Sequence, residues 1–160
     1  MTDIPVPRDG IPATGGPGPR DDNEAACLSD LYTRIVDTLA GYDKLMDKAE
    51  AEFLGVAGAF RNLHRIHRDR VAEMLHQLGH EPREGASLVG TVNRAAVEIR
   101  SWFDDLSHNV MDALVDGERQ VLEAFQTAIT ASPSPERRGV LQQMHGELSA
   151  LLRQHAPEGT

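Results

Sequence analysis

Cysteine, aromatic residues and long apolar runs are all scarce in this sequence of 160 residues. A single cysteine, Cys27, cannot form an internal disulfide, which is typical of a reducing compartment. No apolar run approaches the roughly 20 residues that a membrane helix requires. The first residues also lack the basic segment and apolar stretch of a signal peptide. We therefore expect a cytoplasmic protein that has no membrane partner.

Positive charge is also in short supply, since the formal net charge is −9. An acidic surface repels the phosphates of nucleic acids, so the composition argues against a nucleic-acid partner. Aromatic residues make up only 4 % of the chain, whereas Leu, Ala, Glu and Arg are abundant. This balance favours helices over strands, and the length suits one domain.

Proline and glycine are concentrated in the first part of the chain, where no helical or strand period is visible. A segment of that composition cannot build a core. We therefore predict a disordered arm over residues 1–23 and a single helical domain over residues 24–156.

Apolar residues recur at intervals of three and four from residue 28 onward, which predicts amphipathic helices. Gly55 and Gly58 interrupt the pattern and predict a tight turn over 52–58, and Gly79 predicts the end of the second helix. The predicted helices cover 24–51, the stretch between 58 and 79, 87–106, the stretch between 109 and 131, and the stretch after 135.

The lengths of the connections predict the topology. Short turns join the first two helices and the last two, so each pair forms an antiparallel hairpin. About 30 residues, including helix 87–106, join the hairpins and return the chain to the starting end. The expected fold is all-α: a ferritin-like antiparallel four-helix bundle of two helical hairpins, with an additional crossover helix between the second and third bundle helices.

Four polar residues interrupt the apolar stripes of the predicted bundle helices: Tyr42, His67, Glu118 and His145. The segments around Tyr42 and Glu118 resemble each other, as do those around His67 and His145, which suggests an old duplication. The four side chains are therefore expected to share one layer at the middle of the bundle. A buried carboxylate is costly without a partner, so Glu118 requires one.

This layer has two interpretations. One is a hydrogen-bonded polar layer that sets the register of the helices. The other is a metal site, because ferritin-like proteins bind two metals with glutamates and two Glu-x-x-His pairs. Only one of the expected carboxylates is present, which argues against iron chemistry of the ferritin kind but allows one iron, zinc or manganese ion. The candidate ligands are Tyr42, His64, His67, Glu118 and His145.

Three short motifs resemble a bacterial family of ferritin-like helical proteins that is classed as a domain of unknown function. They are Gly-Tyr at 41–42, Leu-Gly-x-x-Pro at 78–82 and Gly-Glu at 117–118, and the segment at 87–92 adds to them. The resemblance extends over about residues 28–154. It implies the helical-bundle fold and little about activity, because a fold does not by itself define a function.

The leading functional hypothesis is a non-enzymatic helical-bundle protein with a structural or stress-related role, acting as a homo-oligomer. One alternative is a metal-binding or iron-oxidising bundle with a degenerate metal site. Another is an adaptor that binds a protein partner through the arm and the crossover helix, where Trp102 and Phe103 lie.

Overall fold

The computed structural model describes residues 19–47, 51–83 and 110–155. These residues form four helices and no strand: α1 (Pro19–Met46), α2 (Ala51–Gln77), α4 (Val110–Ala131) and α5 (Pro135–His155). The predicted crossover helix at 87–106 and most of the predicted arm lie outside the described residues. The all-helical prediction is confirmed for the part that can be compared.

Three predicted helix boundaries differ from those in the structure. Helix α1 begins at Pro19, so residues 19–23 are helical rather than part of the arm, and it ends at Met46 rather than at residue 51. Helix α2 begins at Ala51, so the predicted turn over 52–58 is helical. Glycine costs only about 1 kcal/mol in a helix, and burial of neighbouring Ala57 and Phe60 outweighs that cost.

The other helix ends follow the expected chemistry. Gly79 adopts a φ of +78°, and the amide of His80 donates to the carbonyl of Leu75 at 2.9 Å, which is a Schellman cap. At the start of α5, the Ser134 hydroxyl accepts a hydrogen bond from the amide of Arg137 at 3.3 Å, and Pro135 occupies the first helical position. Both boundaries confirm the sequence prediction.

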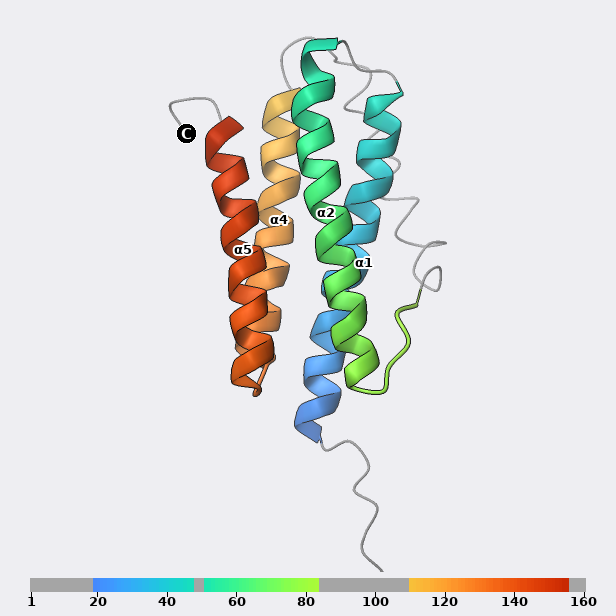
Figure 1. The fold of residues 1–160 in the computed structure, drawn as a ribbon, viewed down its shortest axis with the longest axis vertical. Coiled ribbons are helices and arrows are strands. Elements are labelled where there is room, and N and C mark those ends of the chain that lie inside the picture. Colours follow the sequence, from blue (N-terminus) through green and yellow to red (C-terminus); the bar gives the residue numbers. More distant parts are fainter. Residues whose placement is uncertain (1–18, 48–50, 84–109, 156–160) are drawn as a thin grey trace, which may run out of the picture.

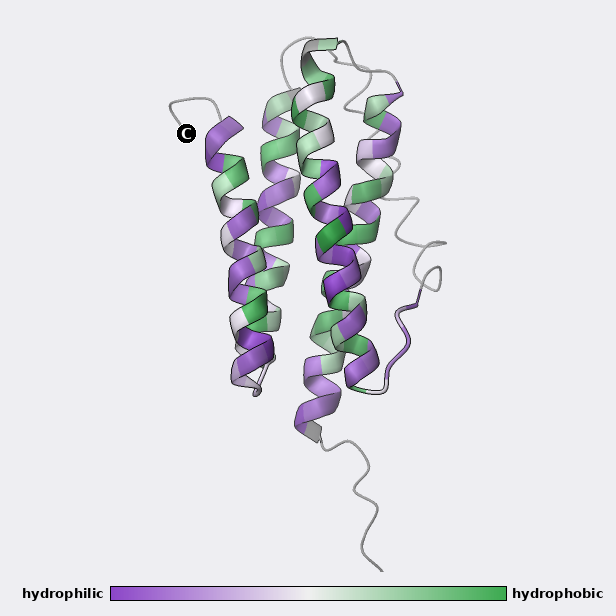
Figure 2. Cartoon of the chain, viewed as in Figure 1, coloured by the Kyte–Doolittle hydropathy of each residue, from purple (hydrophilic) through white to green (hydrophobic). Residues whose placement is uncertain are grey.

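The four helices form a bundle in which α1 lies beside α2 and α4, and α5 lies beside α4 and α2 (Figure 1). Each hairpin is antiparallel, whereas α2 and α4 run in the same direction (Figure 1). Hydrophobic and hydrophilic residues alternate along every helix, as expected when one face of each is buried (Figure 2). None of the four described helices is long and apolar enough to span a membrane.

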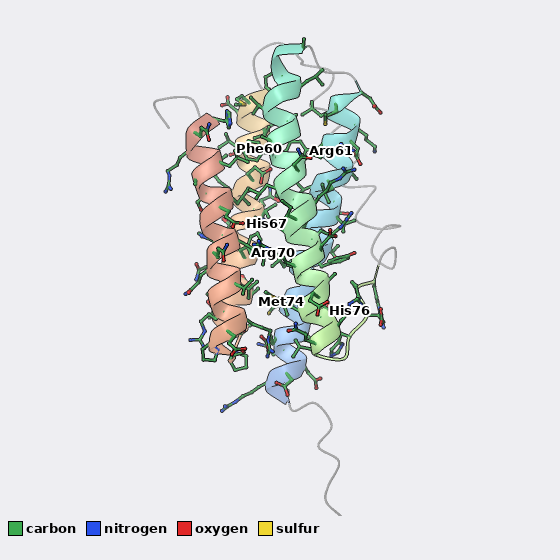
Figure 3. The ribbon with its side chains drawn as sticks, in the orientation of Figure 1. Phe60, Arg61, His67, Arg70, Met74 and His76 are labelled. Carbon is green, nitrogen blue, oxygen red and sulfur yellow. The ribbon has the colours of Figure 1, made fainter. Side chains whose placement is uncertain are left out.

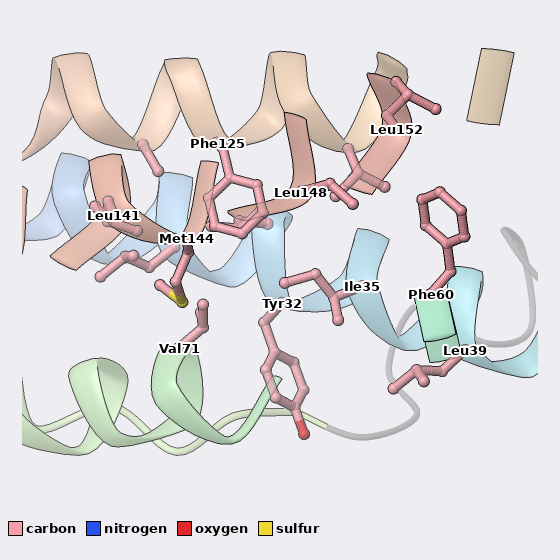
Figure 4. Close-up of a cluster of buried hydrophobic side chains, with 14 of the residues drawn as sticks. Tyr32, Ile35, Leu39, Phe60, Val71, Phe125, Leu141, Met144, Leu148 and Leu152 are labelled. Atoms are coloured by element: carbon pink, nitrogen blue, oxygen red, sulfur yellow. The ribbon is translucent and has the colours of Figure 1, made fainter. Parts of the chain in front are cut away.

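The core is made of side chains from all four helices that are almost completely shielded from solvent (Figure 4). In α5, the buried residues recur at intervals of three and four. Burying each large apolar side chain contributes about 1.5–3 kcal/mol, so this core dominates the stability of the bundle. The largest apolar members are Phe60, Phe125, Leu28, Leu31, Ile35, Leu75, Leu141, Met144 and Leu148.

A buried ion pair holds one end of the bundle together. Glu24 in α1 is fully buried, and it accepts hydrogen bonds from the Arg137 guanidinium at 2.8 and 2.9 Å and from the Ser132 hydroxyl at 2.5 Å. Burial raises the pKa of Glu24, but the hydrogen bonds from Arg137 and Ser132 and the charge of Arg137 outweigh that effect, so the pKa is lowered overall. We call these three residues the Glu24 clasp.

Candidate functional site

A second buried carboxylate lies in the middle of the bundle. Glu118 of α4 is 1 % exposed, and both of its oxygens have partners. The Tyr42 hydroxyl of α1 donates to Oε1 at 2.5 Å, and Nε2 of His64 in α2 lies 2.9 Å from each oxygen. One carboxylate therefore connects three helices.

Aromatic packing keeps Tyr42 in this position. Its ring stacks on that of Phe60, with centroids 6.1 Å apart, and on that of His64, with centroids 5.9 Å apart. Burial raises the pKa of Tyr42 well above its ordinary value of 10, and the neighbouring Glu118 raises it further. The hydroxyl therefore stays protonated and donates a hydrogen bond to the carboxylate.

A second imidazole, one turn further along α2, pairs with a different carboxylate. His67 is fully buried, and its Nε2 lies 2.9 Å from Oε2 of Glu147 in α5. Its ring meets that of Phe125 edge to face, with centroids 5.4 Å apart. Figure 3 shows His67 and Arg70 on the side of α2 that faces α5. We call Tyr42, His64, Glu118, His67 and Glu147 the mid-bundle layer.

Burial lowers the pKa of His67, and the nearby charges of His64 and Arg70 act in the same direction, while the hydrogen bond to Glu147 opposes them. The same hydrogen bond lowers the pKa of Glu147. The pair is therefore a neutral imidazole that donates to an ionised carboxylate.

The structure brings together only part of the predicted layer. Tyr42, His64 and Glu118 meet directly, and His67 lies next to them, but His145 is only half-buried and hydrogen-bonds to no residue in the described chain. Glu147 takes the place that His145 was predicted to hold, and His64 takes the predicted place of His67 beside Glu118. The expected hydrogen bonding of His67 and His145 to Glu118 is therefore wrong.

Helix geometry explains both differences. The segment of α2 that lies opposite Tyr42 runs from Phe60 to His64. Phe60 stacks on Tyr42 itself, and Arg61 bonds to the adjacent Asp43. In α5, His145 and Glu147 flank the buried stripe of Met144 and Leu148 on opposite sides, because successive residues are 100° apart. Only the flank that carries Glu147 bonds to α2. The sequence shows both flanking residues but not which flank faces α2.

The other nitrogen of each buried imidazole has no hydrogen-bond partner among the described residues. Nδ1 of His64 and Nδ1 of His67 are both buried, and neither forms a hydrogen bond within the described chain. Because Nε2 is the donor to a carboxylate in each ring, a neutral imidazole leaves Nδ1 as an unprotonated lone pair. A second proton would create a buried N–H without an acceptor, which is costly. Hydrogen-bond geometry therefore places the proton of a neutral ring on Nε2 rather than on Nδ1 in both histidines.

The same atoms test the iron site of ferritin-like proteins, and they do not fit it. Such a site needs four carboxylates, whereas this layer has two, and each is already bonded to an imidazole. A metal on Nε2 would move the ring proton to Nδ1, where it has no acceptor. Within residues 19–47, 51–83 and 110–155, no three His, Cys, Asp or Glu side chains are grouped so as to hold a metal ion.

Cys27 and the aromatic pair Trp102 and Phe103 are the remaining residues that the sequence brings into question. Burial and the nearby Asp30 raise the pKa of the Cys27 thiol, which makes it a poor nucleophile. Trp102 and Phe103 lie outside the described residues.

Comparison with known proteins identifies a family. The model of a family described as a domain of unknown function (DUF2383) matches residues 23–131, which is more than half of the chain and includes most of α1 and all of α2 and α4. Four members of the mid-bundle layer fall within the match, whereas Glu147 falls beyond it. No curated protein and no solved structure matches the chain.

Proposed function

Since this chain belongs to the DUF2383 family, whose description defines no activity, we propose a function from its geometry. The protein is a non-enzymatic, ferritin-like helical bundle with a structural or stress-related role, and the mid-bundle layer determines how its helices pair. The observation that carries this proposal is the bonding of Glu118, which joins α1, α2 and α4.

The ferritin-like topology is part of the proposal. It is supported by the two antiparallel hairpins and by the parallel course of α2 and α4, which a long connection joins (Figure 1). The likeness concerns the arrangement of the helices and not the chemistry of the layer.

A polar layer suits the setting of register because its cost depends on alignment. A buried carboxylate without its partners costs several kcal/mol, whereas an apolar core tolerates a shifted helix much better. If α1 or α2 slid by one turn, Glu118 would lose the Tyr42 hydroxyl or the His64 imidazole. The layer therefore penalises wrong pairings even where it adds little stability to the correct one.

Replacing the three central residues with apolar ones tests this role. The triple variant Tyr42→Phe, His64→Leu, Glu118→Leu is expected to unfold at a similar or higher urea concentration but to give broadened or duplicated amide signals in NMR spectra, because several registers become populated. A matched control is Phe125→Leu, which alters the same core without removing a polar contact. A triple variant with a single sharp set of wild-type-like signals would refute the register role.

The expectation that the chain forms a homo-oligomer is kept as part of this proposal. Light scattering of the purified full chain tests it, and a monomer at micromolar concentration would contradict it.

A further inference from the structure

Helix α5 is joined to the rest of the bundle differently from the other three helices. The bonds of Glu118 connect α1, α2 and α4, and no residue of α5 takes part in them. The family match covers the same three helices, apart from the first residues of α1, and ends at the last residue of α4. We call α1, α2 and α4 the three-helix unit, against which α5 packs.

The contact between α2 and α5 depends on a single carboxylate. It is the least extensive of the four close contacts between helices. Among the described residues, every side-chain hydrogen bond or ion pair between these two helices involves Glu147. Its Oε2 lies 2.9 Å from Nε2 of His67 and 3.6 Å from a guanidinium nitrogen of Arg70, on the side of α2 that faces α5 (Figure 3). Between Glu147 and the end of α5, no described side chain hydrogen-bonds to another helix.

Two exposed apolar side chains show that α2 and α5 do not cover each other completely. Ile66 of α2 is 50 % exposed, and Val140 of α5 is 37 % exposed. Ile66 lies four residues before Arg70, and Val140 lies seven residues before Glu147, so each is on the flank that faces the other helix. Solvent therefore reaches apolar side chains at both edges of this contact.

The start of α5 is fixed firmly. Arg137 belongs to the Glu24 clasp, which ties this end of α5 to α1. The adjacent Arg138 donates to the carbonyl of Ser132 at 3.0 and 3.1 Å and so holds α5 to the end of α4. Because these hydrogen bonds come from charged guanidinium groups, they resist movement of this end more strongly than neutral ones would.

Packing becomes looser toward the other end of α5. Leu141 and Leu148 are fully buried, whereas Leu151, one turn further along, is only half-buried. The last residue, His155, is also half-buried, and its ring centroid lies 6.1 Å from that of Phe60 in a tilted contact. The helix is therefore anchored at one end and held less tightly at the other.

We propose that α5 is a hinged helix, which pivots at the Glu24 clasp, and that Glu147 is the latch that holds its second half against α2. When the bonds of Glu147 to His67 and Arg70 break, residues 148–155 move away from α2, and the three-helix unit stays packed. Exposing only the last two turns of α5 requires less free energy than unfolding the whole bundle. This device goes beyond the register role, since Glu118 aligns the three-helix unit without any bond to α5.

Hydrogen exchange of backbone amides in the full chain, measured at low urea concentrations, tests whether α5 opens separately. Tyr42→Phe weakens the three-helix unit but not the latch. It should therefore speed exchange of the slowest amides of α1 and α4 roughly 30-fold and leave exchange at residues 148–155 unchanged. Equal acceleration at all these amides would overturn the proposal, because α5 would then open only when the whole bundle unfolds.

Glu147→Ala tests the latch itself. It should speed exchange at residues 148–155 about 10-fold, because the closed state loses bonds that the open state does not have. Glu136→Ala, which removes the other glutamate of α5, is the matched control and should leave these amides as in the wild type. If the two variants had the same effect, Glu147 would not be the latch.

A milder variant keeps the test decisive if Glu147→Ala folds poorly. Glu147→Gln retains an oxygen that accepts the N–H of His67 but loses the charge that attracts Arg70, so exchange at residues 148–155 should be about 3-fold faster than in the wild type. Exchange at the wild-type rate would overturn the role of Glu147. Neither outcome would affect the register role, which the apolar triple variant tests separately.

Discussion

Two buried glutamates in this bundle have hydrogen-bond partners of different charge. Glu24, near the start of α1, faces the permanently charged guanidinium of Arg137. Within the described residues, Glu118, at mid-height, bonds only to the hydroxyl of Tyr42 and the imidazole of His64. Both carboxylates are essentially inaccessible to solvent. The difference lies in whether the partner brings a fixed charge.

That difference suggests a division of roles. An ion pair with arginine neutralises Glu24 at every pH at which the carboxylate is ionised, so the Glu24 clasp is suited to holding an end of the bundle closed. The partners of Glu118 carry no fixed charge, and their hydrogen bonds depend on the alignment of three helices. The mid-bundle layer is therefore suited to specificity, and the comparison can be tested in four ways.

The largest effect is expected from breaking the clasp. Arg137→Met leaves Glu24 buried with only the Ser132 hydroxyl, and we expect the free energy of unfolding in urea to fall by about 3 kcal/mol. The double variant Glu24→Leu, Arg137→Met should recover most of this loss, because it removes the unpaired charge. A single variant that loses less than about 1 kcal/mol would show that the clasp is not an effective ion pair.

A smaller loss is expected at the mid-bundle layer. Tyr42→Phe removes one hydrogen bond to Glu118 but leaves His64 in place, so we expect a loss of about 2 kcal/mol. Repeating the change in a Glu118→Gln background gives a double-mutant cycle, in which the coupling between the two positions should be about 1 kcal/mol or more. Simple additivity would mean that the contact contributes nothing specific.

The Glu24 clasp also leads to a prediction about stability in acid. Because the pKa of Glu24 is lowered in the folded protein, the unfolded state binds more protons just below pH 4.5. The contribution of the clasp is therefore complete above that pH and is lost as the pH falls through the folded pKa. Melting temperatures between pH 5 and pH 3 should fall less steeply in Glu24→Gln than in the wild type, and parallel curves would contradict this.

The smallest effect is expected at an exposed carboxylate. Asp43 accepts a hydrogen bond from Arg61 at 2.5 Å, but its side chain is 55 % exposed. Asp43→Asn should therefore change the free energy of unfolding by only about 0.5 kcal/mol, and 0.5 M salt should reduce the difference further. A loss as large as that of Tyr42→Phe would show that burial is not what separates these carboxylates.

Much of the fold could be read from local patterns. Periods of three and four identify the helices, and the glycine at 79 and the Ser-Pro pair at 134–135 mark two of their ends, because capping depends on neighbouring residues. The turn placed over 52–58 failed for a physical reason. Glycine lowers the helical preference only slightly, and the burial that compensates for it is not visible in a local pattern.

The sites show the same limit. Polar residues on the apolar stripes identified Tyr42, His67, Glu118 and His145, and the Glu-x-x-His spacing added His64. Glu147 was missed because it lies on the flank of its helix. Glu24 and Arg137 were missed as well, since 113 residues separate them and each looks like an ordinary surface residue in its own helix.

The sequence by itself determined that this chain is helical, which face of each helix is apolar, and that a glutamate must be buried in α4. Those properties depend on residues three or four positions apart. Only the tertiary structure decided that His64 rather than His67 meets Glu118, that Glu147 rather than His145 completes the layer, and that Arg137 neutralises Glu24. Such pairings depend on the rotation and relative height of two packed helices, which many distant contacts set together.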